Sequence, residues 1–305
     1  MEEIPKDLPV CHICGSSESG FFCEKNGHKL YDCTQCDFTF VHPIPKDLAK
    51  IYGENYFKND GTDKEKGSAG YTDYDKDKEP MREVFELYLK KLEQLAPGKR
   101  LFDVGAATGY FLDIAKRGGW KTYGSEISPY ALRVARSRGH EMTEGSITGE
   151  MHVQVDAATL WDVLEHVDDP RAYLLALNRM LPTGGMLAIN TVDRSSLWAR
   201  VLGKRWHLIV PPEHLYYYAP GNLTMLLRDT GFEVLEVKKI GKKFSPTYVF
   251  KTLAAWQGLA FWETLARVSD RPLLRKLALP INLRDNVFVL AKKSGEVSKE
   301  QSARA

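Results

Sequence analysis

The stretch that decides the fold is KRLFDVGAATGYFLDIAKRGG, from Lys99 to Gly119. Its first part, KRLFDV, is a short apolar run typical of a buried strand, and FLDIAKRGG is typical of a helix that ends at glycines. The turn between them contains Gly105 and Gly109, which allow the backbone to come close to a ligand. The spacing matches neither the G-x-G-x-x-G dinucleotide fingerprint nor a G-K-[ST] P-loop.

The pattern continues on both sides of this turn. WKTYGSE, ending at Glu126, predicts a second strand, and PYALRVARSRG predicts a second helix that stops at Gly139. A helix is expected upstream, from Met81 to Leu95. Strands alternating with helices at this spacing predict an α/β fold with a doubly wound parallel sheet. At the end of its strand, Glu126 is placed to accept both hydroxyls of a ribose.

The composition is that of an ordinary globular protein. The chain has 305 residues, 43% hydrophobic and 27% charged, with a net charge of +2. It contains no apolar window of 18 residues, and the acidic N-terminus MEEIPKDLPV has no signal-peptide character, so we expect a cytoplasmic protein. Residues 1–50 carry five Lys/Arg against eight Asp/Glu (5 − 8 = −3), whereas residues 238–305 carry fourteen against five (14 − 5 = +9). The acidic front argues against nucleic-acid binding there.

Four of the five cysteines form two pairs, Cys11 with Cys14 and Cys33 with Cys36. The 18 residues between the pairs (33 − 14 − 1 = 18) fall within the spacing of a zinc ribbon. Two such knuckles can complete a tetrahedron of thiolates around one zinc ion. We expect this zinc to be structural, because a catalytic ion would keep one ligand position open. Cys23 is expected to be a small buried residue.

The expected organisation has four parts. These are a zinc ribbon (1–45), a charged and mobile linker (46–80), the α/β domain (81–293) and a disordered tail (294–305). Two insertions are expected within the domain, a lid over 192–220 and a helical segment over 244–280.

Three further motifs sharpen this interpretation. DVGAATGYF, YGSEIS and VDAATLWDVLEHVDDPRAYLLALNRMLPTGGMLAINT resemble, in order, the motifs of class I S-adenosylmethionine-dependent methyltransferases. The resemblance runs from about Lys99 to Glu236, and within that superfamily the chain is similar to ubiquinone-pathway O-methyltransferases and to methyltransferases that act on sugars. The cysteine segment is similar to that of some deoxysugar C-methyltransferases. The resemblance implies a Rossmann-like, seven-stranded, mostly parallel sheet.

It also implies roles for individual residues. It assigns Asp103, Gly105, Ala107 and Gly109 to the methionine part of S-adenosylmethionine, Glu126 to the ribose, Ile127 and Ser146 to the adenine, and Leu160 and Trp161 to the methyl-donor side. Ser146 stands where many relatives carry an acidic residue, and Ala107 stands where many carry glycine.

The stretch PPEHLYYY, Pro211 to Tyr218, lies in the long segment after the strand 185–191. We expect it to belong to a substrate lid, because long loops at the carboxyl ends of parallel strands are usually functional. An imidazole is well suited to remove a proton from the acceptor, so His214 is the candidate base, with Glu213 to orient it. His207, Tyr216 and Tyr217 are the candidate substrate contacts. The alternatives are that His214 and the tyrosines pack a hairpin, or that His214 binds the substrate without taking its proton.

WDVLEHVDDP carries three further polar candidates, Asp162, Glu165 and His166. They can be catalytic, but carboxylates also suit the N-terminal end of a helix. We expect at least two of the three to be structural, and Trp161 can belong to the core instead of the cofactor site.

The insertion over 244–280 is rich in large apolar residues, among them Phe250, Trp256, Phe261 and Trp262. It can be a packed cap or homodimer surface, a peripheral membrane contact through 247–280 near a lipid-linked substrate, or a wall of the substrate pocket.

We therefore expect methyl transfer from S-adenosylmethionine to a small molecule, a sugar, sugar nucleotide or lipid-linked precursor, with O-methylation favoured over C-methylation. The alternatives are an RNA methyltransferase, which the acidic ribbon disfavours, and a non-catalytic binding module, which the intact DVGAATG loop disfavours.

Overall fold

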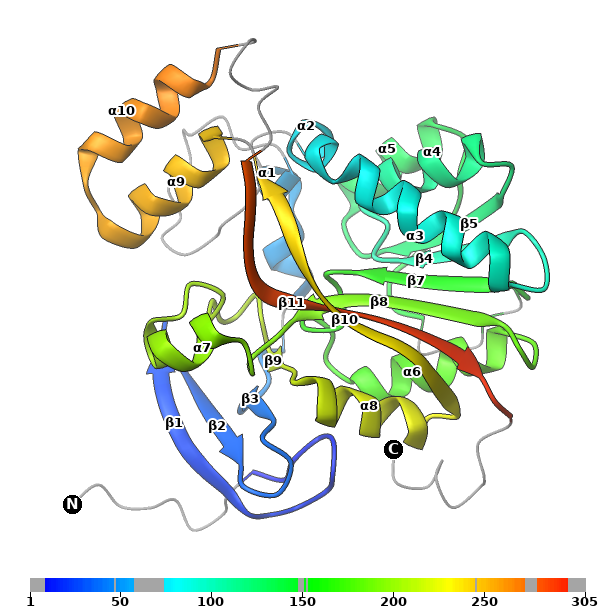
Figure 1. Ribbon diagram of the computed structural model, residues 1–305, viewed down its shortest axis with the longest axis horizontal. Coiled ribbons are helices and arrows are strands. Elements are labelled where there is room, and N and C mark those ends of the chain that lie inside the picture. The colour runs from blue at the N-terminus through cyan, green and yellow to red at the C-terminus, as the bar shows by residue number, and fades with distance from the viewer. Residues whose placement is uncertain are drawn as a thin grey trace.

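The computed structural model describes residues 9–46, 48–57, 74–147, 151, 153–244, 246–271 and 279–295. Within these residues the strands form two sheets (Figure 1). The larger sheet has seven strands in the order β10-β11-β8-β7-β4-β5-β6, and the smaller has four in the order β1-β2-β3-β9.

The larger sheet confirms the predicted fold. Its parallel strands are β4 (Arg100–Val104), β5 (Lys121–Glu126), β6 (Glu141–Glu144), β7 (Ala157–Trp161) and β8 (Met186–Val192). Two long antiparallel strands, β10 (Phe232–Phe244) and β11 (Leu279–Lys293), complete the β8 edge. The sheet is thus mostly parallel, as the alternation of strands and helices predicts.

Helices cover both faces of this sheet (Figure 1). One face carries α3 (Arg82–Leu95), α4 (Tyr110–Arg117) and α5 (Pro129–Ser137), and the other carries α6 (Pro170–Met180) and α8 (Pro220–Asp229). Consecutive strand residues serve opposite faces: Leu101 packs in the cluster with α3 and α4, whereas Phe102 packs in the cluster with α6 and α8. Both faces are therefore buried, which explains the apolar runs of the parallel strands.

The smaller sheet joins the cysteine segment to the α/β domain. Its first strands are β1 (Ser19–Lys25), β2 (His28–Cys33) and β3 (Thr39–Val41), and its fourth is β9 (Tyr216–Tyr217). Thr39 pairs with Tyr217, and Phe40 pairs with Tyr216. PPEHLYYY thus ends as a strand of the cysteine-segment sheet.

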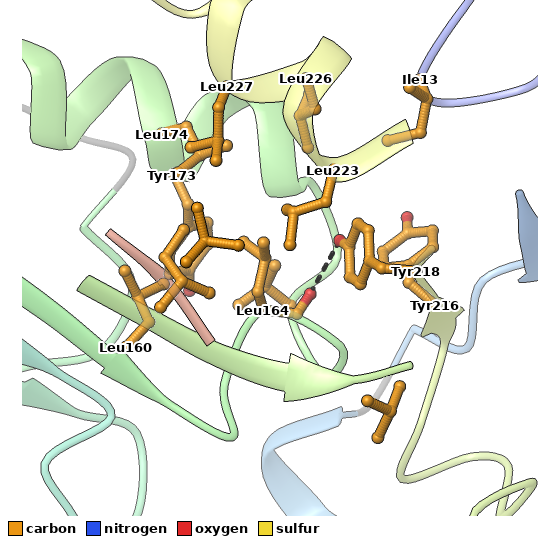
Figure 2. Close-up of a cluster of buried hydrophobic side chains, with 14 of the residues drawn as sticks. Ile13, Leu160, Leu164, Tyr173, Leu174, Tyr216, Tyr218, Leu223, Leu226 and Leu227 are labelled. Atoms are coloured by element: carbon orange, nitrogen blue, oxygen red, sulfur yellow. Dashed lines mark hydrogen bonds between the residues drawn. The ribbon is translucent and has the colours of Figure 1, made fainter. Parts of the chain in front are cut away.

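A common core lies under this junction. Ile13 of the cysteine segment, Tyr216 and Tyr218 gather beside the leucines of α8, and the Tyr218 hydroxyl donates to the Leu164 carbonyl at 3.1 Å (Figure 2). Phe38 is fully buried there, with its ring centroid 5.3 Å from that of Tyr218. The cysteine segment and the domain therefore share one hydrophobic core.

The segment 46–80 differs from the predicted linker. Its described parts form η1 (Leu48–Tyr52), α1 (Glu54–Phe57), α2 (Tyr74–Lys78) and η2 (Glu79–Met81). Buried Tyr52 and Phe57 pack in one cluster with Ala107 of the glycine-containing turn and with Ala131 of α5. Aromatic side chains spaced among the charged residues provide this packing. The many charged residues are the reason that the sequence predicts a linker.

The two insertions contain short helices. The first holds α7 (Leu197–Leu202), η3 (Gly203–Arg205) and β9, and the second holds α9 (Pro246–Gln257) and α10 (Ala260–Ser269) at the end of the β10–β11 arm (Figure 1). The side chain of Trp256 and residues 296–305 of the predicted tail lie outside the described residues. Among the helices that the structure describes, none has the length and apolarity needed to cross a membrane.

Candidate active site

The glycine-containing turn leads from β4 into α4 and is built from left-handed backbone. Gly105, Ala107 and Gly109 have φ angles of 62°, 51° and 84°. A Cβ atom at Gly109 would lie 2.8 Å from Cδ2 of His140, so the turn has no room for a side chain at this position. The amides of the turn are thereby brought to the carboxyl end of β4, where open α/β sheets bind their ligands.

Glu126 lies beside this turn, at the end of β5. It is 5% exposed, and its two carboxylate oxygens accept hydrogen bonds from the amides of Ala107 and Ser128, both at 2.8 Å. Burial raises the pKa of this carboxyl group above its ordinary value, and the backbone donors oppose that shift. The carboxylate that the sequence assigns to a ribose is therefore held against the predicted cofactor turn.

Asp103, the last residue but one of β4, is a second buried carboxyl group. Thr159 donates to its Oδ1 at 2.6 Å. Burial, with a smaller contribution from the negative charge of Glu126, raises the pKa of Asp103 to about 8 against the opposing effects of the Thr159 bond and the charge of Lys78. A cation bound next to Asp103 would stabilise the ionised form.

A pocket opens at this edge of the sheet. It is lined by Tyr74, Lys78, Phe85, Asp103, Gly105, Ala106, Tyr110, Phe111 and Trp161. Trp161 thus lines the pocket, whereas the fully buried side chain of Leu160 points to the opposite face of the sheet (Figure 2). The reason is the alternation of side chains along β7, which prevents two neighbours from lining the same pocket.

Helix α2 supplies pocket residues that the sequence analysis missed. Asp75 accepts a hydrogen bond from Thr108 of the turn and forms an ion pair with Arg138. The amine of Lys78 lies 3.4 Å from Oδ2 of Asp162, which follows β7. Tyr74 and Lys78 of α2 line the pocket, and these contacts connect the helix to the turn and to the end of β7. The charge density of the segment was the only signal in the sequence, and it indicated a linker.

The two residues predicted near the adenine lie at the same edge of the sheet. Half-buried Ile127 packs against the cluster that contains Ala107. Ser146 is exposed, and its hydroxyl bonds with Tyr173 of α6. The roles of both residues stay predictions.

The predicted base lies in an irregular turn. The amides of Glu213 and His214 both reach the carbonyl of Val210, at 3.0 Å and 3.3 Å, so these two residues do not form a strand. Nδ1 of His214 donates to the Leu208 carbonyl at 2.9 Å. The backbone carbonyl of Glu213, whose side chain is buried, accepts from Nδ1 of His166 at 2.7 Å.

His166 and His214 meet although 47 residues separate them. Their ring centroids lie 4.7 Å apart with an interplanar angle of 77°, and Glu165 joins them in one cluster. The hydroxyl of Tyr52 also lies 2.9 Å from Nδ1 of His166. The motif VLEHV after β7 contains Glu165 and His166 and was the sequence signal for this cluster. The sequence analysis instead expected these polar residues to lie at the start of a helix.

The predicted substrate contacts have different surroundings. Tyr216 and Tyr217 are fully buried, and their hydroxyls donate to the carbonyls of Asp168 and His214. Burial raises the pKa of both phenols above the ordinary value. His207 lies 3.5 Å from Asp285 of β11. Complete burial favours the packing alternative for the two tyrosines, because no part of either ring is accessible to a substrate.

The four predicted metal ligands come together at the front of the cysteine segment. Their sulfur atoms all lie within 4.8 Å of one another, with 3.6 Å between Cys11 and Cys36 and 3.5 Å between Cys14 and Cys33. Zn–S bonds of about 2.3 Å place the corners of a tetrahedron about 3.8 Å apart, so this thiol set fits a zinc ion.

Comparisons with known proteins identify the class that this fold and site define. The model of the family described as "Methyltransferase domain" matches residues 76–237, which is just over half of the chain. The chain therefore belongs to this family, and it is an S-adenosylmethionine-dependent methyltransferase.

The individual relatives have low sequence identity to this chain. Two are named ubiquinone biosynthesis O-methyltransferase: one from Paracidovorax citrulli is 26% identical over 55% of this chain and 77% of its own length. The other, from Xylella fastidiosa, is 24% identical over 70% of this chain and 87% of its own length. Among solved structures, a magnesium protoporphyrin IX methyltransferase from Synechocystis with bound S-adenosylhomocysteine is 15% identical, covers 75% of this chain and 90% of its own, and has a TM-score of 0.48.

Proposed function

We propose that the protein transfers the methyl group of S-adenosylmethionine to a hydroxyl group of a small-molecule acceptor. The observation that carries this proposal is the placement of the buried Glu126 carboxylate against the left-handed turn at Ala107. Relatives named O-methyltransferases, at 24–28% identity, support oxygen as the methylated atom.

The proposed cofactor roles agree with the lining of the pocket. The turn from Asp103 to Gly109 would hold the methionine part, with Asp103 near its ammonium group, and Glu126 would accept the ribose hydroxyls. Trp161 would face the methyl-donor side from the end of β7. Ile127 and Ser146 would flank the adenine.

The transfer needs little beyond positioning, because the sulfonium already activates the methyl group. The acceptor oxygen attacks the methyl carbon, the C–S bond breaks, and S-adenosylhomocysteine leaves. The acceptor must also lose its proton. Because Nδ1 of His214 donates to Leu208, its lone pair lies on Nε2, which suits the predicted role as base. Glu213 would orient it through the irregular turn.

We infer that the four-cysteine cluster holds a structural zinc ion. All four ligand positions are provided by the protein, so none is left for substrate. Contacts across the junction support a stabilising role: the Arg171 guanidinium donates to the Ile13 carbonyl at 2.9 Å, and the Asn222 amide donates to the Cys36 carbonyl at 3.1 Å.

The acceptor and the partners of the chain stay predictions. A sugar, sugar nucleotide or lipid-linked precursor is the predicted acceptor. In the second insertion, Leu259 and Phe261 are 54% and 62% exposed, which supports contact of this segment with a second copy or a membrane surface.

The acceptor proposal is tested with methyl-labelled S-adenosylmethionine and a fractionated extract of the source cells. Label found in small molecules in the form of methyl ethers supports O-methylation of a small acceptor. Label in RNA that is lost at high salt would replace the acceptor class with nucleic acid. Binding of S-adenosylmethionine with no transfer to any fraction would support a binding module.

A further inference from the structure

One side-chain cluster at the edge of the sheet has a composition that the transfer reaction alone does not require. Glu165, His166 and His214 each offer a ligand atom, and these atoms lie within 4.8 Å of one another. We propose that the three residues bind a divalent transition-metal ion, separate from the zinc of the cysteine cluster, and that this ion holds the acceptor oxygen.

The hydrogen bonds of the histidines prepare both rings for this role. A backbone carbonyl can only accept, so the rings of His166 and His214 must donate from Nδ1 to Glu213 and Leu208, at 2.7 Å and 2.9 Å. In a neutral imidazole this places the lone pair on Nε2. Metal-binding histidines almost always donate their other ring N–H to a carbonyl or carboxylate in this way, which sets the tautomer and the ring orientation.

The carboxylate is prepared in the same way. Glu165 is 1% exposed, and its Oε2 accepts a hydrogen bond from Thr191 at 2.8 Å. A carboxylate taken out of water is costly unless a positive charge or strong donors compensate it. A divalent cation would supply that charge, and Thr191 would orient the carboxylate as a second partner.

The ligand set indicates the kind of ion. Two imidazoles with one carboxylate suit zinc, manganese and iron(II) better than magnesium or calcium, which prefer oxygen ligands throughout. Three protein ligands leave coordination positions open, as in catalytic sites and unlike the closed set of four cysteines. A metal at this position is therefore able to accept substrate oxygens.

The cluster lies on the side of the sheet where the cofactor turn lies. Glu165 is four residues beyond Trp161, which lines the pocket. Tyr52 connects the two places, since its ring packs in the cluster of Ala107 and its hydroxyl lies 2.9 Å from Nδ1 of His166. The segment 48–57 thus bridges the proposed metal site and the proposed cofactor turn.

The consequence for the reaction rests on the proposed methyl transfer. A metal ion lowers the pKa of a bound hydroxyl group, so the acceptor would lose its proton to water and attack the methyl carbon as the C–S bond breaks. The products are the methyl ether, S-adenosylhomocysteine and one proton. An acceptor with two adjacent oxygen atoms fits best, because both can enter the open positions. In this form of the reaction His214 is a metal ligand in place of the base proposed above, and water takes the proton.

Metal content tests this proposal directly. The full-length protein is dialysed to equilibrium against micromolar Zn²⁺, and bound zinc is measured by elemental analysis. We expect two ions per chain for the wild type, and one for Glu165→Gln and for His214→Gln. His207→Gln is the matched control, because this histidine lies by Asp285 and outside the cluster, and it should bind two. One ion in the wild type, or two in both cluster variants, would overturn the proposal.

Calorimetry with S-adenosylhomocysteine on the same preparations separates this proposal from the proposed function. Binding that is unchanged in Glu165→Gln shows that the variant is folded with an intact cofactor site. Loss of the second ion together with retained cofactor binding supports the metal site. Cofactor binding and methyl transfer by a wild type that holds one ion would overturn the metal site and leave the methyltransferase standing.

Discussion

Replacing Phe38 by alanine tests whether the cysteine segment is part of the domain core. Phe38 is fully buried, and its ring lies against Phe40, Tyr216 and Tyr218, with centroids 5.8, 5.6 and 5.3 Å away. Removing a buried phenylalanine ring costs about 3–5 kcal/mol, from lost transfer free energy and the cavity left behind. Since whole domains are stable by only about 5–15 kcal/mol, this is a large fraction of the free energy of unfolding.

The assay is urea unfolding followed by tryptophan fluorescence and, separately, by binding of S-adenosylhomocysteine. With a slope of about 3 kcal/mol per molar urea, the midpoint should fall by about 1 to 1.7 M for both signals. Phe21→Ala is the control, because this ring is 55% exposed and its loss should change the stability by less than about 1 kcal/mol. If Phe38→Ala disrupts only the cysteine segment and both midpoints stay at the wild-type value, the shared core is refuted.

Three other predictions concern the cofactor site. Asp103 has a pKa of about 8 in the folded protein, above its unfolded value, so its contribution to stability is present at low pH and is lost as the pH rises through 8. Binding of a cationic cofactor favours the ionised form of Asp103 and therefore releases its proton. The affinity for S-adenosylmethionine, measured by calorimetry, should rise with pH up to about 8. In Asp103→Asn this dependence of affinity on pH should be absent. Gly109→Ala should destabilise the protein by at least 1 kcal/mol more than Gly184→Ala in thermal melts, because both have left-handed backbone but only the first meets a side chain at 2.8 Å; equal losses would contradict the close approach. Glu126→Gln should weaken binding of S-adenosylhomocysteine about tenfold or more, an estimate for one charge-assisted hydrogen bond, and unchanged affinity would remove Glu126 from the site.

Local pattern predicted the central sheet well. The strands and helices from Arg100 to Ser137 are short, apolar and bounded by glycines, so neighbouring residues specify them. The cysteine cluster was equally predictable, because its four cysteines form two close pairs at the spacing of a zinc ribbon. In both cases the information lies within about twenty residues of sequence.

Contacts between distant segments were not readable in the same way. Thr39 pairs with Tyr217, 178 positions further along the chain (217 − 39 = 178). No local sequence pattern predicts that this distant strand joins the sheet of the cysteine segment. For this reason the tyrosines of PPEHLYYY were assigned to a substrate lid although they are core residues. The meeting of His166 with His214 has the same origin, since each is supported by a different loop.

The side-chain direction of strand residues explains a further difference. Leu160 and Trp161 are adjacent in β7, so only Trp161 can face the pocket. Helix α2 was missed because its charged residues act at the site: Asp75 bonds to Thr108, and Lys78 reaches Asp162. A charge-dense segment is indistinguishable from a linker until its partners are known.

The most direct test of the central claim is calorimetric titration of the full-length protein with S-adenosylhomocysteine. We expect one binding site per chain, for which S-adenosylmethionine competes. A protein that melts cooperatively and yet shows no binding of either compound would contradict the assignment of the Asp103–Gly109 turn and Glu126 as the cofactor site.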